Sequence, residues 1–233
     1  MKNYFLLTII FFVFSISYSQ NNIEDLMNQI KMVKFWDEAN GLAIGQTSLL
    51  STQDGGISWS RYNLKRRYSS PKPLVDIEVV GTNVGIVSGG TGLLLQTSDN
   101  GVSWNKIPLL EGNEKVTGVS YNSNSIFLVG YHDTPDNEDA FIYKSEDNGI
   151  TWSNLPSNLN AVVSQNSKLD LEFINDTTAI LWGGINLLKT EDAGTSWEIV
   201  SNSSTPNIRK IQFLDETNWY ANIGSDIYKT EDG

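Results

Sequence analysis

The stretch Thr52-Gln-Asp-Gly-Gly-Ile-Ser-Trp59 recurs along the chain, and its recurrence decides the fold. Full copies follow at 97–104, 145–152 and 190–197, and a shortened copy occupies 230–233. The shared pattern is Ser/Thr-x-Asp-x-Gly-x-Ser/Thr-Trp, and its Asp residues are 45, 48, 45 and 40 residues apart. A β-propeller blade repeats every ~40–50 residues. The spacing therefore predicts an all-β propeller with one such box in each blade.

The segments between the boxes predict four short antiparallel strands in every repeat. In the first repeat, Met32-Val-Lys-Phe-Trp-Asp-Glu-Ala-Asn-Gly-Leu-Ala-Ile-Gly45 reads as an alternating strand, a polar turn and a second apolar strand. A third strand enters the box and a fourth leaves it, as expected for a blade. The predicted units are a lead-in at 20–29 and blades at 30–68, 74–110, 115–157, 168–202 and 208–233, the last incomplete.

The box itself is interpreted as a structural turn rather than a catalytic site. Its Asp can accept backbone N–H bonds across the hairpin between strands three and four, and its Gly supplies a conformation that a Cβ would hinder. Its Trp is expected to turn into the apolar layer. The residues with these predicted structural roles are Asp54, Gly56, Trp59, Asp99, Gly101, Trp104, Asp147, Gly149, Trp152, Asp192, Gly194, Trp197 and Asp232.

Together, these signatures resemble the BNR/Asp-box superfamily, and within it the photosystem II assembly and stability factor family, the Ycf48-like group. The residues that carry the resemblance are Val33–Gly45 followed by 52–59, and the likeness runs from about residue 30 to the end. It implies a seven-bladed ring with a non-enzymatic, protein-binding role. Four complete repeats and a started fifth are fewer than closed propellers usually have. We therefore expect a fragment of a longer protein, with closure by a partner chain as the alternative.

The N-terminus has the pattern of a signal peptide over residues 1–19. Lys2 precedes an apolar run over 4–16, and the small residues Ser17 and Ser19 lie just before a cut ahead of Gln20. That run is too short to span a bilayer comfortably. We expect a secreted, periplasmic or cell-surface protein without membrane insertion after cleavage. The chain contains no cysteine, so stability comes from packing rather than disulfides.

The charge balance restricts the partners. The chain has 16 basic and 27 acidic residues, a formal charge of −11. Such a chain repels phosphate backbones and anionic headgroups, which disfavours nucleic acid and membrane surfaces. Protein is the expected partner, with a glycan as the alternative, and no metal or organic cofactor is implied.

Glycoside hydrolysis is the rival hypothesis. Sialidases share the Asp box but need three arginines around the substrate carboxylate. The four arginines here are Arg61, Arg66, Arg67 and Arg209, and the first three fall in one inter-blade stretch, so sialidase chemistry is disfavoured. Other Asp-box glycosidases use two carboxylates across a cleft, and no local spacing selects such a pair here.

Two charged segments are further candidates. Asp133, Asp136 and Asp139 lie in an acidic insertion with oxygen ligands suited to Ca²⁺, but the spacing of a known Ca²⁺-binding loop is absent, which favours a solvated loop. The stretch with Arg61, Lys65, Arg66 and Arg67 is expected either to dock an acidic peptide or polyanionic glycan, or to form an exposed connection. The sole histidine, His132, is expected to face water. Among the tryptophans outside the boxes, Trp182 is predicted to pack in the core. For Trp36 and Trp219, which lie next to turns, the sequence does not decide between core packing and ligand contact.

Overall fold

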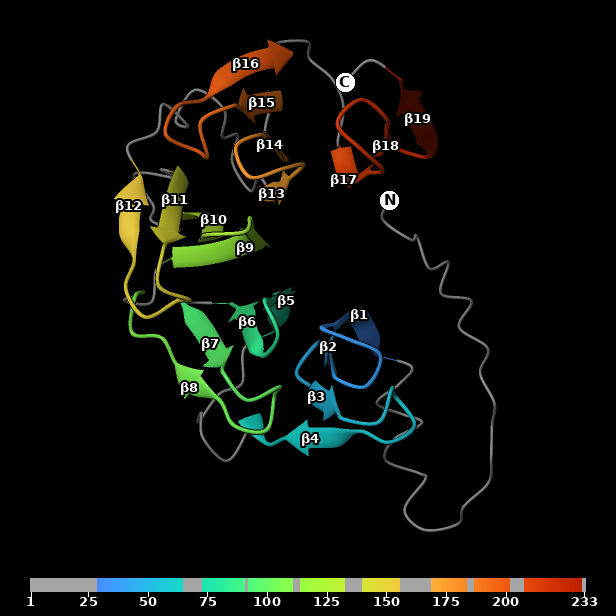
Figure 1. The fold of residues 1–233 in the computed structure, drawn as a ribbon, viewed down its shortest axis with the longest axis vertical. Helices are drawn as coiled ribbons and strands as arrows, with labels where there is room; N and C mark the ends of the chain where they lie inside the picture. The colour runs from blue at the N-terminus through green and yellow to red at the C-terminus, as the bar shows by residue number, and fades with distance from the viewer. Residues whose placement is uncertain are drawn as a thin grey trace.

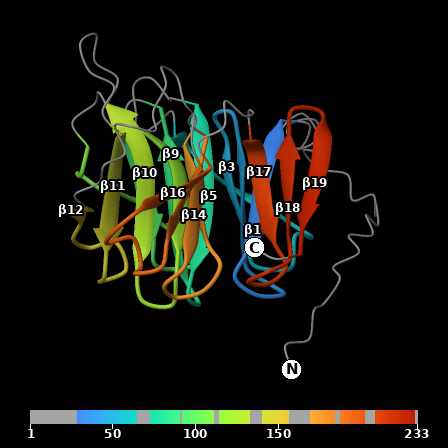
Figure 2. The ribbon, with the colours of Figure 1, turned by 90° about the horizontal axis from the view of Figure 1, so that it is seen from above.

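The chain forms five antiparallel sheets arranged as an arc around a common axis (Figure 1). The computed structural model describes residues 29–64, 73–90, 92–110, 114–132, 140–155, 169–183, 187–201 and 208–231. The first strand of each sheet lies nearest the axis and the last lies outermost (Figure 1). Seen from the side, the strands of all five sheets run roughly along that axis (Figure 2). The predicted all-β propeller of antiparallel blades is confirmed.

Each sheet is built from strands that are consecutive in sequence. The first blade contains β1 (Ile30–Phe35), β2 (Gly41–Gly45), β3 (Leu49–Thr52) and β4 (Ser60–Tyr62). The second contains β5 (Leu74–Val80), β6 (Val84–Gly89), β7 (Leu93–Thr97) and β8 (Asn105–Lys106). The third contains β9 (Glu114–Tyr121), β10 (Ile126–His132), β11 (Ala140–Ser145) and β12 (Ser153–Leu155). The fourth contains β13 (Asp170–Phe173), β14 (Ala179–Trp182), β15 (Leu187–Thr190) and β16 (Glu198–Ser201). The fifth contains, among the described residues, β17 (Ile208–Phe213), β18 (Trp219–Ile223) and β19 (Asp226–Thr230).

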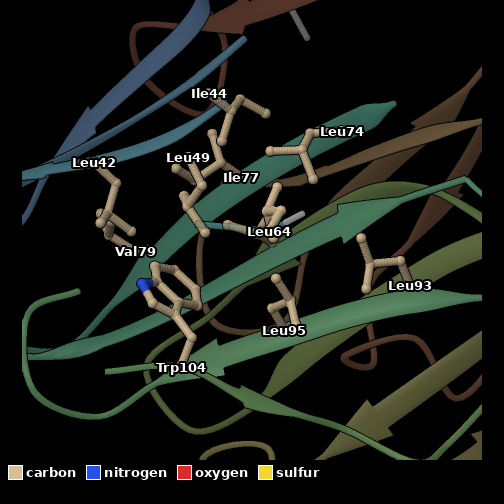
Figure 3. Close-up of a cluster of buried hydrophobic side chains, with 11 residues drawn as sticks. Leu42, Ile44, Leu49, Leu64, Leu74, Ile77, Val79, Leu93, Leu95 and Trp104 are labelled. Carbon is tan, nitrogen blue, oxygen red and sulfur yellow. The ribbon is translucent and has the colours of Figure 1, made fainter. Parts of the chain in front are cut away.

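The hydrophobic core consists of layers between neighbouring blades. In the layer between the first two blades, Leu42 and Ile44 of the first blade pack near Ile77, Leu95 and Trp104 of the second (Figure 3). Three similar layers join the following pairs of blades. Burying one Leu or Ile side chain is worth ~1.5–3 kcal/mol, whereas one net hydrogen bond is worth ~0.5–1.5 kcal/mol. The inter-blade layers therefore provide most of the stability.

The box turns hold the hairpins between the third and fourth strands. In the first box, the Thr52 hydroxyl donates to Asp54 Oδ1 at 2.8 Å and accepts the Gly56 N–H at 2.9 Å. Asp54 also accepts the Ser58 N–H at 2.9 Å and the Ser58 hydroxyl at 2.6 Å. The Trp59 indole donates to the Gly56 carbonyl at 3.1 Å. The Asp54 carboxylate and the Thr52 hydroxyl thus take part in four of the five bonds that close the turn.

The other three described boxes repeat these five bonds. The distances from the first Ser or Thr hydroxyl of the box to the carboxylate are 2.7–2.8 Å, and the indole–carbonyl distances are 3.1–3.2 Å. Hydrogen bonds from the Ser58 hydroxyl and N–H lower the pKa of Asp54 to about 2, and those from Thr151 do the same for Asp147. Asp232 of the fifth box lies outside the described residues.

Two consecutive residues in each described box have positive φ. The box glycines Gly56, Gly101, Gly149 and Gly194 have φ of 82° to 89°. The residue before each has φ of 56° to 72°, and these residues are Gly55, Asn100, Asn148 and Ala193. Glycine and asparagine tolerate this left-handed conformation, but alanine does not favour it. Ala193 is therefore the strained member of the set.

The two end faces of the arc expose positions that are buried between blades elsewhere. Val33 and Phe35 of β1 are 47% and 37% exposed, whereas Ile77 and Val79 at the same positions of β5 are 0% and 8% exposed. On the opposite end face, Ile227 of β19 is 75% exposed. Both end faces therefore have the apolar character of an inter-blade layer, which is consistent with a larger ring.

We predict that Ala193→Gly raises the free energy of unfolding by about 0.5–1 kcal/mol, because glycine removes the left-handed strain at the cost of some chain entropy. Urea unfolding measures the effect. Ala140→Gly in β11 is the control, since this residue is extended and the change should destabilise the protein. Destabilisation by both changes would contradict the assignment of strain to Ala193.

Candidate functional site

The first strands of the blades carry charged side chains close to the ring axis. We name these six residues the axis charge cluster: Lys34, Asp76, Glu78, Asp170, Glu172 and Lys210. They come from β1, β5, β13 and β17, which line the axis in Figure 1. The corresponding positions of β9 are held by Gly118 and Ser120. The cluster is therefore assembled from blades that are far apart in sequence.

A repeated β-bulge positions these side chains. In four of the innermost strands one extra residue interrupts the pairing with the second strand, namely Lys31, Val75, Thr117 and Arg209. A bulge bends its strand and re-aims the side chains that follow it. The bulged residue directly precedes Met32, Asp76, Gly118 or Lys210. The same backbone irregularity thus recurs next to the axis in these blades.

Ion pairs and hydrogen bonds of the cluster link neighbouring blades. Lys34 Nζ of the first blade lies 2.9 Å from Glu78 Oε2 of the second. Lys210 Nζ of the fifth lies 3.5 Å from Asp170 Oδ2 and 3.6 Å from Glu172 Oε2 of the fourth. Asp76 Oδ2 of the second blade accepts the Val119 N–H of the third at 2.7 Å. Each of these contacts crosses an inter-blade boundary.

The charges also act on one another across the axis. Burial alone would lower the pKa of Lys34, but Glu78, Asp76 and Glu172, the last from the fourth blade, raise it. For Lys210, burial is likewise outweighed by the carboxylates of Asp170, Glu172 and Asp76. Burial raises the pKa of Glu172. The six groups therefore form one electrostatic unit.

Asp76 has the most perturbed environment in the cluster. Burial, followed by the charge of Asp170, raises the pKa of Asp76 to about 7, although it accepts the N–H groups of Val119 and Ile77. Asp170 also approaches the third blade, since a Cβ added to Gly118 would lie 2.9 Å from Asp170 Oδ1. The two carboxyl groups therefore reach adjacent residues of β9. Strongly perturbed carboxyl groups are more frequent at functional sites than elsewhere.

The charged segments selected from the sequence do not join this cluster. Arg61 lies exposed on β4, the outermost strand of its blade, and its Nη2 donates to Ser48 Oγ at 3.3 Å. Its companions Lys65, Arg66 and Arg67 lie outside the described residues, as do Asp133, Asp136 and Asp139 of the acidic insertion. His132 is half-buried at the end of β10, with Nδ1 3.9 Å from Glu114 Oε1.

The tryptophans outside the boxes contribute to packing. Trp182 is 1% exposed. The Trp36 indole N–H donates to the Val84 carbonyl of the next blade at 2.7 Å. Trp219 is partly buried beside Phe213 in the layer between the last two blades.

Sequence reasoning missed the axis charge cluster, although a signal for it existed. The innermost strands of the second and fourth blades both contain Asp-x-Glu, at Asp76–Glu78 and at Asp170–Glu172. Within the described ranges, no three His, Cys, Asp or Glu residues are placed to hold a metal ion. No helix there is long and apolar enough to span a membrane.

Comparison with protein families gives a match over residues 15–165 to the photosynthesis system II assembly factor YCF48 family. The matched segment is more than half of the 233-residue chain. This chain belongs to the YCF48 family. No curated protein matches the sequence.

Two of the solved structures that are similar in fold to this YCF48-family chain are much longer than it. The GH74 enzyme of Niastella koreensis is 14% identical, with a TM-score of 0.61, over 84% of this chain and 35% of its own. The extracellular domain of the one-component system BT4673 of B. thetaiotaomicron is 14% identical, with a TM-score of 0.64, over 87% of this chain and 27% of its own. This chain thus spans about a third of these relatives. YCF48 bound to D1 peptide is 17% identical, with a TM-score of 0.34, over 88% of this chain and 93% of its own.

We predict that Asp76→Asn flattens the dependence of stability on pH. In this YCF48-family protein the folded state retains the Asp76 proton up to about pH 7, whereas an unfolded Asp loses it near pH ~4. The folded state then binds more protons, so the free energy of unfolding falls as pH rises between these values. Urea unfolding across this range measures the slope. Asp226→Asn on the exposed strand β19 is the matched control, and an equal slope in both variants would contradict the prediction.

Proposed function

We propose that this chain is a non-catalytic scaffold that binds a protein partner on the inner face of its blades, outside the cytoplasm. The observation that carries the proposal is the axis charge cluster. Membership of an assembly-factor family supports a protein-binding role, and the signal-peptide pattern of residues 1–19 supports export. The partner is a protein, because polar groups from several blades can hold a peptide segment along one face.

The energetics support a binding role for the cluster. The inter-blade layers already stabilise the fold, and partly buried charges lose hydration energy that ion pairs only partly return. The raised pKa of Asp76 shows that its ionised form is disfavoured in this chain. Natural proteins retain such unfavourable groups where function requires them. A partner that supplies complementary groups recovers this cost on binding.

Glycoside hydrolysis is the second candidate function. It is favoured by the neighbouring carboxyl groups of Asp76 and Asp170, one of which has a raised pKa as a general acid requires. The similarity to GH74 enzymes, at 14% identity or less, bears on the fold alone. The scaffold role is preferred because the family to which this chain belongs is one of assembly factors.

A site-specific photo-crosslinker tests the scaffold role. Placed at Gln212, an exposed residue of β17 beside the axis charge cluster, it should capture a protein in the source cells. The control position is Val102, which is 64% exposed on a box turn away from β17. Equal capture at both positions, or none at Gln212, would contradict the proposal. Release of reducing sugar from xyloglucan that is lost in Asp76→Asn would favour the hydrolase instead.

A further inference from the structure

The axis charge cluster has more acidic than basic groups. Its four carboxyl groups face two ammonium groups, and the latter are already engaged: Lys34 pairs with Glu78, and Lys210 is shared by Asp170 and Glu172. Among the described residues, Asp76 has backbone hydrogen-bond partners but no ion pair. A ligand that complements the ionised carboxylate at this position is therefore a cation.

An unsatisfied hydroxyl lies next to Asp76. Ser88 of β6 is 0% exposed, and its Oγ has no hydrogen-bond partner in the described part of the chain. Ser88 is paired directly with Asp76 across the two strands. Directly opposed residues of antiparallel strands project from the same face of the sheet. Ser88 is therefore on the Asp76 side of the blade, where its oxygen can accept a hydrogen bond. A buried, unpaired polar atom costs ~1–3 kcal/mol, which a donor from a ligand would remove.

Resting on the proposed function, we infer that the axis binds an arginine side chain of the partner protein, with the guanidinium group held by Asp76 and Asp170. A guanidinium has five N–H donors in a planar fork and can contact two carboxyl groups and a hydroxyl at once. An ammonium group is a compact point charge that matches several separated acceptors less well. The net negative charge of the chain attracts such a segment over longer distances.

Binding of the arginine is coupled to the protonation of Asp76. The groups that act on Asp76 are Glu78 on its own strand, Asp170 on β13, Lys34 on β1 and Lys210 on β17; the facing residues of β9 are not titratable. The pKa of Asp76 is about 7 in the free protein, and an adjacent cation lowers it. Binding therefore expels a proton, and the affinity should fall about tenfold from pH 8 to pH 6.

Fluorescence anisotropy with labelled hexa-arginine tests this inference. Asp76→Asn and Asp170→Asn should each weaken binding about tenfold or more, and Asp76→Asn should largely remove its dependence on pH. Asp226→Asn and Glu191→Gln remove one exposed charge each and should change the affinity less than about twofold, since exposed charges contribute little. Hexa-lysine should bind more weakly than hexa-arginine.

Equal effects of the axis and control variants would overturn the inference, as would affinity for hexa-arginine that does not change with pH. Circular dichroism checks that each variant is folded. If Asp76→Asn does not fold, Ser88→Ala gives an independent test, because it removes the hydroxyl that is proposed to accept a hydrogen bond from the guanidinium group. Crosslinking at Gln212 without selective arginine binding would reject the arginine site and leave the scaffold role standing. If neither crosslinking at Gln212 nor selective arginine binding is observed, both the scaffold role and the arginine site are rejected.

Discussion

The bond network around the box carboxylate is the constraint on which the rest of the structure depends. In the first box, Asp54 fixes the hairpin between β3 and β4 through Thr52 and Ser58. This turn sets the strand register, and a slip of one residue would move every side chain to the other face of the sheet. Register at this turn decides which residues of β3 and β4 enter the inter-blade layers. β3 in turn pairs with β2, and β2 with β1, so the turn anchors the outer half of a sheet whose first strand carries Lys34 of the axis charge cluster.

Stability and binding chemistry are located in different parts of each blade. The layers between blades contain fully buried residues such as Leu42 and Ile77, while the boxes contribute exposed hydrogen bonds at the rim. The innermost strands instead carry charges that are costly to desolvate, most clearly at Asp76. Because the layers stabilise the ring, the innermost strands can vary in charge without loss of the fold. Family membership therefore indicates the fold, and in the function that we propose the partner is recognised by these innermost strands.

The propeller architecture could be predicted from the sequence, but the axis charge cluster could not. The box spacing predicted the blades because Asp and Gly at fixed positions have few structural explanations. The second left-handed residue of each described box was not predicted and became apparent only in the structure. Asp76 and Glu78 alternate with apolar residues, as charged residues do in any strand with one solvent-facing side. The pattern therefore could not show that they lie close to charged side chains of other blades. The bulge at Val75 has no sequence signature. The proximity of Asp170 to Gly118, 52 residues away in sequence, depends on the packing of the fourth blade against the third.

Titration of the Asp76 carboxyl carbon by NMR tests most directly whether the innermost strands form one electrostatic unit. We expect a midpoint of about 7 in the native chain, because burial and the charge of Asp170 raise the pKa of Asp76, and a lower midpoint in Asp170→Asn. A native midpoint near the ordinary Asp value of about 4 would contradict it. So would a midpoint that does not change when the charge of Asp170 is removed.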